Sequence, residues 1–311
     1  MKWLLMTVLL ATSASVSAGE PAYSRVEVIY GRAFGTALTM DAFVPKKDAN
    51  GAAIVFAVSE GWYSDHDKIT PNVPVYVEPF VAKGYAVFAV CHGSNPKFAL
   101  PEMIGHLNRA VRFLRHHAAE YGVDPGRIGA TGDSAGAHLA LMLGCAGRDG
   151  DPDAPDPVDR QSSRVQAVVS YFAPTDFLNW GVAGKAMLGD HPSVPVQGAF
   201  DFHRLDPATQ ALRLVTDAKE RAAIGRAVSP ITHVARGNAP TLLVHGDKDE
   251  LIPLQQAEVM AAKLKAAGVP SELIVMPGGG HDEALVKAHG PQALAWFDKY
   301  LAKTPAIPAP K

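Results

Sequence analysis

The chain has little of what marks several protein classes. Among 311 residues there are only two cysteines, Cys91 and Cys145, too few for a disulfide framework. Both lie in apolar stretches, which favours buried, unpaired thiols over a disulfide. The 29 basic and 31 acidic residues nearly balance, and no block of like charges occurs. The sequence therefore gives no electrostatic sign of a nucleic acid partner or of binding to an anionic membrane.

Long hydrophobic runs are also lacking, with one exception at the N-terminus. Residues 1–18 contain Lys2, an apolar run from Trp3 to Ala11, and small residues before Gly19. This order predicts a cleavable signal peptide and a secreted or periplasmic protein. A membrane anchor, the alternative, needs about 20 continuous apolar residues, and serines and a threonine interrupt this stretch. We expect no membrane span in the mature chain.

Motifs for metals and phosphates are missing as well. No histidine, cysteine and carboxylate set has zinc spacing. The glycines at 278–280 lack the Lys-Ser or Lys-Thr pair of a phosphate-binding loop. Five aspartates lie between 149 and 159, but Arg160 stands where a calcium loop starting at Asp149 needs glutamate, so a solvated acidic loop is expected. We expect no metal and no organic cofactor.

The hydrophobic pattern predicts one α/β domain over residues 19–303, followed by a flexible, proline-rich tail at 304–311. Two runs with period-two character flank a turn containing Phe34 and Gly35, which predicts an opening β-hairpin. Short apolar runs typical of strands buried on both faces recur at 52–58, 85–90, 127–131, 165–172, 241–245 and 272–276. Helical patterns alternate with them at 101–121, 135–145, 253–267 and 291–302. The order predicts a doubly wound, mostly parallel sheet.

An insertion at about 177–228 interrupts this alternation. Asp206 and Pro207 resemble an N-cap followed by proline at the first helical position. Apolar and small residues then recur at helical spacing from Leu212 to Ala222. We expect a helical, cap-like segment beginning at Asp206.

The strongest motif is Gly132-Asp133-Ser134-Ala135-Gly136, between a predicted strand and a predicted helix. The glycines two residues before and after the serine remove Cβ atoms that would clash in a sharp turn. The following helix directs backbone N–H groups toward negative charge formed beside the serine. The pattern predicts a nucleophile elbow with Ser134 at its tip.

A nucleophilic serine needs a histidine base and an acid that orients it. A loop after the strand at 241–245 carries Asp247 and Asp249, and a glycine-rich loop after the strand at 272–276 ends in His281. The order serine, acid, histidine along the chain fits a known triad order. Asp249 is preferred as the acid because Asp247 is more typical of a turn former. Structural roles are expected for the histidines on predicted helices, His116, His117 and His138.

Further motifs follow other strands: Ser59-Glu60-Gly61-Trp62, Pro174-Thr175-Asp176, Ser229-Pro230-Ile231, and His245 to Asp249 with Pro253. Together with the elbow and Gly280-His281, they resemble the α/β-hydrolases of the esterase and lipase group. The resemblance is closest to secreted carboxylesterases of the acetylxylan or feruloyl esterase-like (BD-FAE-like) kind, and it runs from Arg25 to the last helix. It implies an α/β-hydrolase fold with Ser134, Asp249 and His281 as the triad.

The resemblance also implies that the loop after the first parallel strand binds the oxyanion. Relatives carry a glycine run there, whereas this chain has Ser59-Glu60-Gly61-Trp62. We expect the donors to be the backbone N–H groups of Gly61, Trp62 and Ala135. A Glu60 carboxylate in the site would oppose the oxyanion, so it should face outward or pair with a cation. The nearby aromatic residues fit a pocket wall and the core equally well: Trp62, Tyr63, Phe177 and Trp180.

These observations predict a secreted serine carboxylesterase acting on a small-molecule or polysaccharide-linked ester, such as an acetylated or feruloylated polysaccharide or a short-chain acyl ester. A serine peptidase of the prolyl oligopeptidase kind would share the triad, but nothing before the hydrolase motifs could form a propeller. A catalytically inactive hydrolase-fold binding module is kept open only by Glu60.

Overall fold

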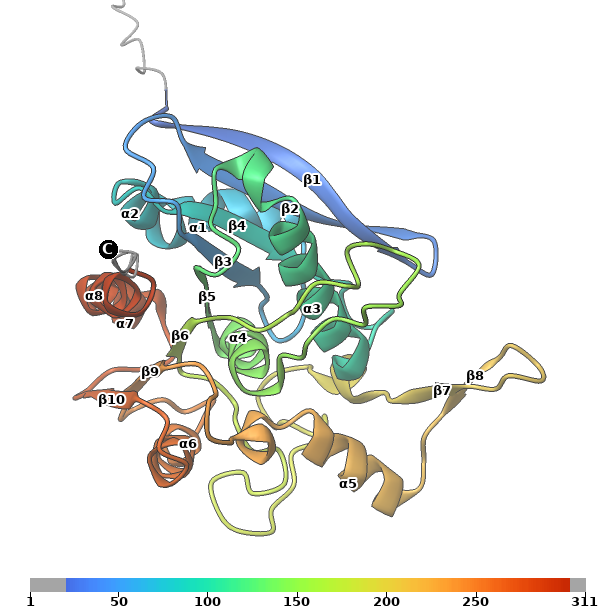
Figure 1. Ribbon diagram of the computed structural model, residues 1–311. Helices are drawn as coiled ribbons and strands as arrows, with labels where there is room; N and C mark the ends of the chain where they lie inside the picture. The colour runs from blue at the N-terminus through green and yellow to red at the C-terminus, as the bar shows by residue number, and fades with distance from the viewer. Residues whose placement is uncertain (1–20, 303–311) are drawn as a thin grey trace, which may run out of the picture.

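The structure, a computed structural model, describes residues 21–302 and is built around an eight-stranded sheet (Figure 1). The strand order is β1-β2-β4-β3-β5-β6-β9-β10. The two pairs that involve β2 are antiparallel, and every other pair is parallel. The strands are β1 (Tyr23–Ala33), β2 (Thr36–Pro45), β3 (Ala53–Val58), β4 (Ala86–Cys91), β5 (Ile128–Asp133), β6 (Ala167–Tyr171), β9 (Thr241–Gly246) and β10 (Ser271–Met276). The predicted signal peptide and tail lie outside the described residues.

The opening hairpin is confirmed. Phe34 and Gly35 connect β1 to β2 with φ angles of 46° and 75°. Positive φ at both central residues is typical of a type I′ turn, whose twist matches that of the flanking strands. The hairpin extends the parallel sheet at one edge through the pairing of β2 with β4.

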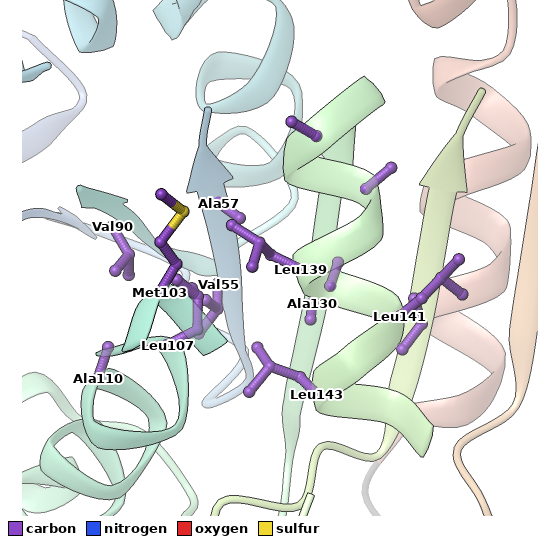
Figure 2. Close-up of a cluster of buried hydrophobic side chains, with 14 of the residues drawn as sticks. Val55, Ala57, Val90, Met103, Leu107, Ala110, Ala130, Leu139, Leu141 and Leu143 are labelled. Atoms are coloured by element: carbon purple, nitrogen blue, oxygen red, sulfur yellow. The ribbon is translucent and has the colours of Figure 1, made fainter. Parts of the chain in front are cut away.

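Helices cover both faces of the sheet. One core cluster joins the sheet to α3 (Leu100–His116), α4 (Ser134–Ala146) and α6 (Gln255–Ala266). The opposite cluster contains α1 (Ile69–Tyr76), α2 (Glu78–Val81), α7 (Glu283–Ala288) and α8 (Gly290–Tyr300). Figure 2 shows Leu139 of α4 and Met103 and Leu107 of α3 beside Val55 and Ala57 of β3. These two layers on a buried sheet confirm the predicted architecture.

Two expectations about the elements need correction. The strand at 271–276 is not buried on both faces, because β10 is an edge strand with partly exposed residues. The helices α1, α2 and α7 were not predicted. In α1, Pro71 and Pro74 argue against a helix, yet Ile69, Val73 and Tyr76 are buried there. Tertiary burial outweighs local propensity in that segment.

The predicted helix beginning at Asp206 is wrong. Residues on either side of it form a two-stranded hairpin, β7 (His203–Leu205) and β8 (Leu212–Leu214), which projects from the body (Figure 1). The Asp206 carboxylate accepts the N–H of Ala208 and Thr209 and the Arg213 guanidinium, and these bonds hold a turn. The helix begins later, as α5 (Ala218–Ala227), where Asp217 caps the N–H of Glu220.

Cys91 and Cys145 are buried and unpaired. In the acidic loop, Asp156 and Asp159 pair with Arg109. Within residues 21–302, no helix is long and apolar enough to cross a membrane. The same part of the chain contains no cluster of three or more histidine, cysteine or acidic residues arranged to hold a metal ion.

Candidate active site

Ser134 lies on a sharp turn between strand and helix. β5 ends at Asp133 and α4 begins at Ser134, with no residue between them. The φ angle of Ser134 is 49°, a left-handed conformation that is uncommon for residues other than glycine and frequent at functional sites. A Cβ on Gly132 would lie 2.6 Å from the carbonyl carbon of Gly136, and one on Gly136 would lie 2.4 Å from the carbonyl oxygen of Ala57. The two glycines are therefore required by close backbone approach, as the motif predicts.

Asp249, in the loop after β9, is surrounded by donors. Its side chain is fully buried. Oδ1 accepts the backbone N–H groups of Leu251 and Ile252, each at 2.9 Å. Oδ2 accepts His281 Nδ1–H at 2.8 Å and lies 3.3 Å from His245 Nε2. Burial alone would raise the pKa of this carboxyl, but the hydrogen bonds from His245 and His281 lower it well below its usual range.

Asp247, the other acid of this loop, has a different role. It is exposed, and its Oδ1 accepts the backbone N–H of Gly278 at 2.7 Å. The carboxylate therefore connects the loop after β9 to the loop after β10. The structure brings Asp249 to His281 and leaves Asp247 as the turn residue.

His281 completes the group of three predicted residues. Its side chain is 17% exposed, and its ring packs against Phe172 at 4.4 Å between centroids. Because Nδ1 donates to Asp249, the neutral ring has its lone pair on Nε2. His281 and Ser134 line the same cavity. No hydrogen bond joins the Ser134 hydroxyl to the ring in the described structure; in enzymes without bound substrate, hydrogen bonds between a base and its proton donor are often long.

The loop after β3 forms a tight turn beside Ser134. Glu60 and Tyr63 exchange two backbone hydrogen bonds of 2.9 Å, and between them Gly61 and Trp62 have φ angles of 55° and 62°. These values make a second type I′ turn. The Gly61 carbonyl accepts Asn95 Nδ2–H at 2.9 Å, and in a trans peptide the next N–H, that of Trp62, points the opposite way.

Gly61, Trp62 and Ala135 all line the cavity that contains Ser134. The N–H groups of Gly61 and Trp62 have no hydrogen-bond partner among residues 21–302. Ala135 lies in the first turn of α4, where backbone N–H groups lack intrahelical acceptors. The three expected donors are thus available to a ligand in the cavity.

Glu60 also lines the cavity, but its carboxylate is paired with a cation. Its carboxylate accepts Lys68 Nζ–H at 2.9 Å, in an ion pair whose side chains are 60% and 41% exposed. The expectation that Glu60 pairs with a cation is therefore met.

The cavity above Ser134 has a volume of about 310 Å³, at the small end of the range for ligand pockets. The 180–196 segment and the loop after β9 supply its apolar wall: Trp180, Met187, Val194, Val196, Leu251 and Ile252. The aromatic candidates divide between the two expected roles. Trp62 and Trp180 line the cavity, Phe177 is fully buried behind them, and Tyr63 is 46% exposed outside it.

The sequence analysis assigns no role of their own to the buried histidines His92, His106 and His245, nor to Asp133. His245 donates Nε2–H to the Ile252 carbonyl at 2.9 Å beside Asp249. His92 accepts the Ser59 hydroxyl at 2.9 Å, and His106 accepts the N–H of Gly93 at 3.1 Å. Burial raises the pKa of Asp133, next to the serine, to about 6. For His138 the sequence does indicate that it lies near the serine, since it follows Ser134 by one helical turn on α4.

Strand order, helix layers and the position of the serine turn define the fold as that of an α/β-hydrolase. Solved structures share it. A truncated carbohydrate esterase from gut microbiota has a TM-score of 0.69 and 24% identity, covering 89% of this chain and 98% of that one. Esterase 2 of Thermogutta terrifontis has a TM-score of 0.66 and 21% identity over 93% of this chain and 95% of that one.

The chain belongs to the BD-FAE family, whose model matches residues 40–264. It is 27% identical over 241 residues to the probable carboxylic ester hydrolase LipM of Mycobacterium tuberculosis, covering 77% of this chain and 51% of LipM. Esterase LipQ of the same organism is 25% identical over 217 residues, which are 70% of this chain and 47% of LipQ. The chain thus spans about half the length of these curated relatives.

Proposed function

We propose that this chain is a secreted serine carboxylesterase acting on esters with a short acyl group. One observation carries the proposal: a histidine held by a buried aspartate faces the same small cavity as a serine on a strand-to-helix turn. Membership of the BD-FAE family and relatives named as ester hydrolases support it. Secretion follows from the predicted signal peptide at residues 1–18.

In the proposed reaction Ser134 Oγ attacks the ester carbonyl while His281 Nε2 accepts the hydroxyl proton. The imidazolium is stabilised by Asp249 and then protonates the departing alcohol oxygen. Water, deprotonated by the same histidine, attacks the acyl-enzyme and releases the carboxylic acid. The N–H groups of Gly61, Trp62 and Ala135 would stabilise the oxyanion in both steps. The scheme uses only side chains and backbone of this chain.

The substrate class is proposed from the size and lining of the cavity. About 310 Å³ with an apolar wall has room for an acetyl or other short acyl group. An acetylated polysaccharide and a small-molecule acyl ester both carry such a group, whereas the feruloyl group of a feruloylated polysaccharide is a larger aromatic acyl group and fits the proposal less well. One solved neighbour is an acetyl ester-xyloside bifunctional hydrolase, which agrees with the first.

The test compares three substrates: an aryl acetate, an aryl octanoate and a dipeptide anilide. We expect hydrolysis of the acetate, a much lower kcat/KM for the octanoate, no anilide cleavage, and loss of activity in Ser134→Ala. Anilide hydrolysis would favour the peptidase. The absence of both turnover and labelling of Ser134 by an organophosphonate would favour an inactive binding module. Either outcome, anilide hydrolysis or this inactivity, would overturn the proposal.

A further inference from the structure

Trp62 adopts a backbone conformation that a bulky side chain disfavours. Its φ of 62° is unusual for a residue other than glycine, and such a residue persists only where surrounding contacts determine its position. The indole is only 3% exposed. It packs edge-on against Phe177 and Phe200, with ring centroids 5.7 and 5.3 Å away.

The polar atom of this indole has a specific partner. Trp62 Nε1–H donates to His138 Nδ1 at 3.2 Å in a buried hydrogen bond. The other ring nitrogen of His138 donates to the Val228 carbonyl at 2.7 Å. An indole N–H only donates and a carbonyl only accepts, so His138 must be neutral with its proton on Nε2. Burial lowers the pKa of His138 to about 4, which keeps the ring in this state at neutral pH.

His138 therefore connects three parts of the chain. It lies on α4, one turn after Ser134 and on the same helix as Ala135. Through Nδ1 it holds the turn that contains Gly61 and Trp62, and through Nε2 it holds the end of the segment that covers the cavity. The ring itself is fully buried and lies 5.8 Å from the indole centroid.

We infer that His138 is a positioning residue for the oxyanion hole, acting through the indole of Trp62. This inference rests on the proposed esterase function. The hole takes donors from two separate elements, the turn at 61–62 and the start of α4. Donors must lie about 2.7–3.1 Å from the developing oxyanion, so the spacing between these elements matters. The bond from the indole to His138 fixes that spacing, because its acceptor belongs to α4.

The same loop has a second attachment of this kind. The Ser59 hydroxyl donates to His92, whose other ring nitrogen donates to the Gly93 carbonyl. The side chains of Ser59 and Trp62, both in this loop, are thus hydrogen-bonded to buried histidines. Of the two histidines, His138 has the more direct effect on the position of the donors, because its partner Trp62 carries one of the proposed donor N–H groups.

The primary test is Trp62→Phe, which removes the indole N–H but keeps an aromatic ring and the backbone donor. Trp296→Phe is the matched control. Trp296, on α8, is also buried, and its Nε1–H donates to the Pro240 carbonyl at 3.3 Å. His138→Gln retains an acceptor and a donor, whereas His138→Leu removes both. Thermal melting of each variant reports folding separately from activity.

Two readouts distinguish positioning from general destabilisation. The first is kcat and KM for an aryl acetate, and the second is the rate ratio between this ester and the corresponding thionoester, whose sulfur accepts hydrogen bonds poorly. Losing one oxyanion donor outright costs roughly 100- to 1,000-fold in kcat, so a displaced turn should cost about 10- to 100-fold. We expect that loss in Trp62→Phe, with KM within about twofold and a lower ester-to-thionoester ratio.

The remaining variants complete the test. We expect His138→Gln to keep kcat within about threefold of wild type, and Trp62→Phe combined with His138→Leu to lose no more than the worse single variant. An unchanged kcat and rate ratio in Trp62→Phe would overturn the inference, as would equal losses in Trp296→Phe. If the wild type hydrolyses no ester, the proposed function fails instead, which keeps the two failures distinct.

Discussion

Replacing Asp249 by asparagine tests the proposed triad most sharply, because the structure dictates how the new amide must lie. Oδ1 of Asp249 accepts two backbone N–H groups at 2.9 Å. In Asp249→Asn the amide oxygen must stay there, since an NH₂ group cannot accept. The amide NH₂ then faces His281 Nδ1, a donor in the native protein.

That arrangement selects the wrong tautomer of His281. To accept from the amide, Nδ1 must lose its proton, so the proton moves to Nε2, the atom proposed to accept the serine proton. In a serine protease the equivalent change lowers kcat by about 10⁴-fold, which corresponds to roughly 5.5 kcal/mol of transition-state stabilisation. We expect a loss of that size here, with KM within a few fold of wild type.

The assay is aryl acetate hydrolysis at pH 7, with kcat and KM determined separately and folding checked by thermal melting. Asp247→Asn is the matched control, because its amide oxygen can still accept the Gly278 N–H. We expect that control to stay within about threefold of wild type. A loss of less than tenfold in Asp249→Asn, or an equal loss in Asp247→Asn, would refute the assignment of the acid.

Three further predictions concern the elbow, the ion pair and acid stability. In Gly136→Ala the new Cβ would lie 2.4 Å from the Ala57 carbonyl oxygen, so α4 must shift. Because a displacement approaching 1 Å costs about 100-fold in rate, we expect kcat/KM for the aryl acetate to fall by about that factor. A kcat/KM equal to that of wild type would contradict this prediction. Glu60→Gln should change kcat less than threefold, because its exposed pair with Lys68 is worth about 0–1 kcal/mol; a large gain in kcat would show that the carboxylate reaches the site. Burial lowers the pKa of three histidines to about 4, below the ordinary 6.5, namely His92, His106 and His138. The unfolded chain therefore binds their protons first, and stability should fall as pH drops from about 6.5 toward 4, by roughly 1–3 kcal/mol per histidine. Asp133, with its pKa raised to about 6, opposes this trend between about pH 3.8 and 6. Urea unfolding at pH 7, 6 and 5 measures the net effect, and a midpoint that does not fall would exclude it.

Sequence alone located the elements that meet at the proposed catalytic edge of the sheet, because that edge follows from the topology. The carboxyl ends of parallel strands lie together, so motifs directly after strands must converge. The serine follows β5, the acid follows β9 and the histidine follows β10, and in the structure Asp249 meets His281 while His281 and Ser134 share one cavity.

Other features depend on contacts that have no local signature. Trp62 and His138 are 76 positions apart, and neither flanking sequence indicates that they pair. His245 lies in β9, four residues before Asp249 in a recognisable motif, but its use as a second donor to Asp249 appears only in three dimensions. The misplaced helix start has a local cause: Asp206 and Asp217 both offer capping carboxylates, and only the second is followed by a helix.

The proposed catalytic residues and the apolar wall of the cavity come from different parts of the chain, which has a consequence for how the substrate preference of such a protein can change. The proposed catalytic residues lie after strands of the sheet, while one contiguous stretch, residues 180–196, supplies much of the apolar wall. In the proposed esterase, replacing that stretch with the corresponding one of a homologue is therefore expected to change the acyl preference and to leave Ser134, Asp249 and His281 in place. The replaced stretch should end before Val228, because the Val228 carbonyl accepts Nε2–H of His138 on α4.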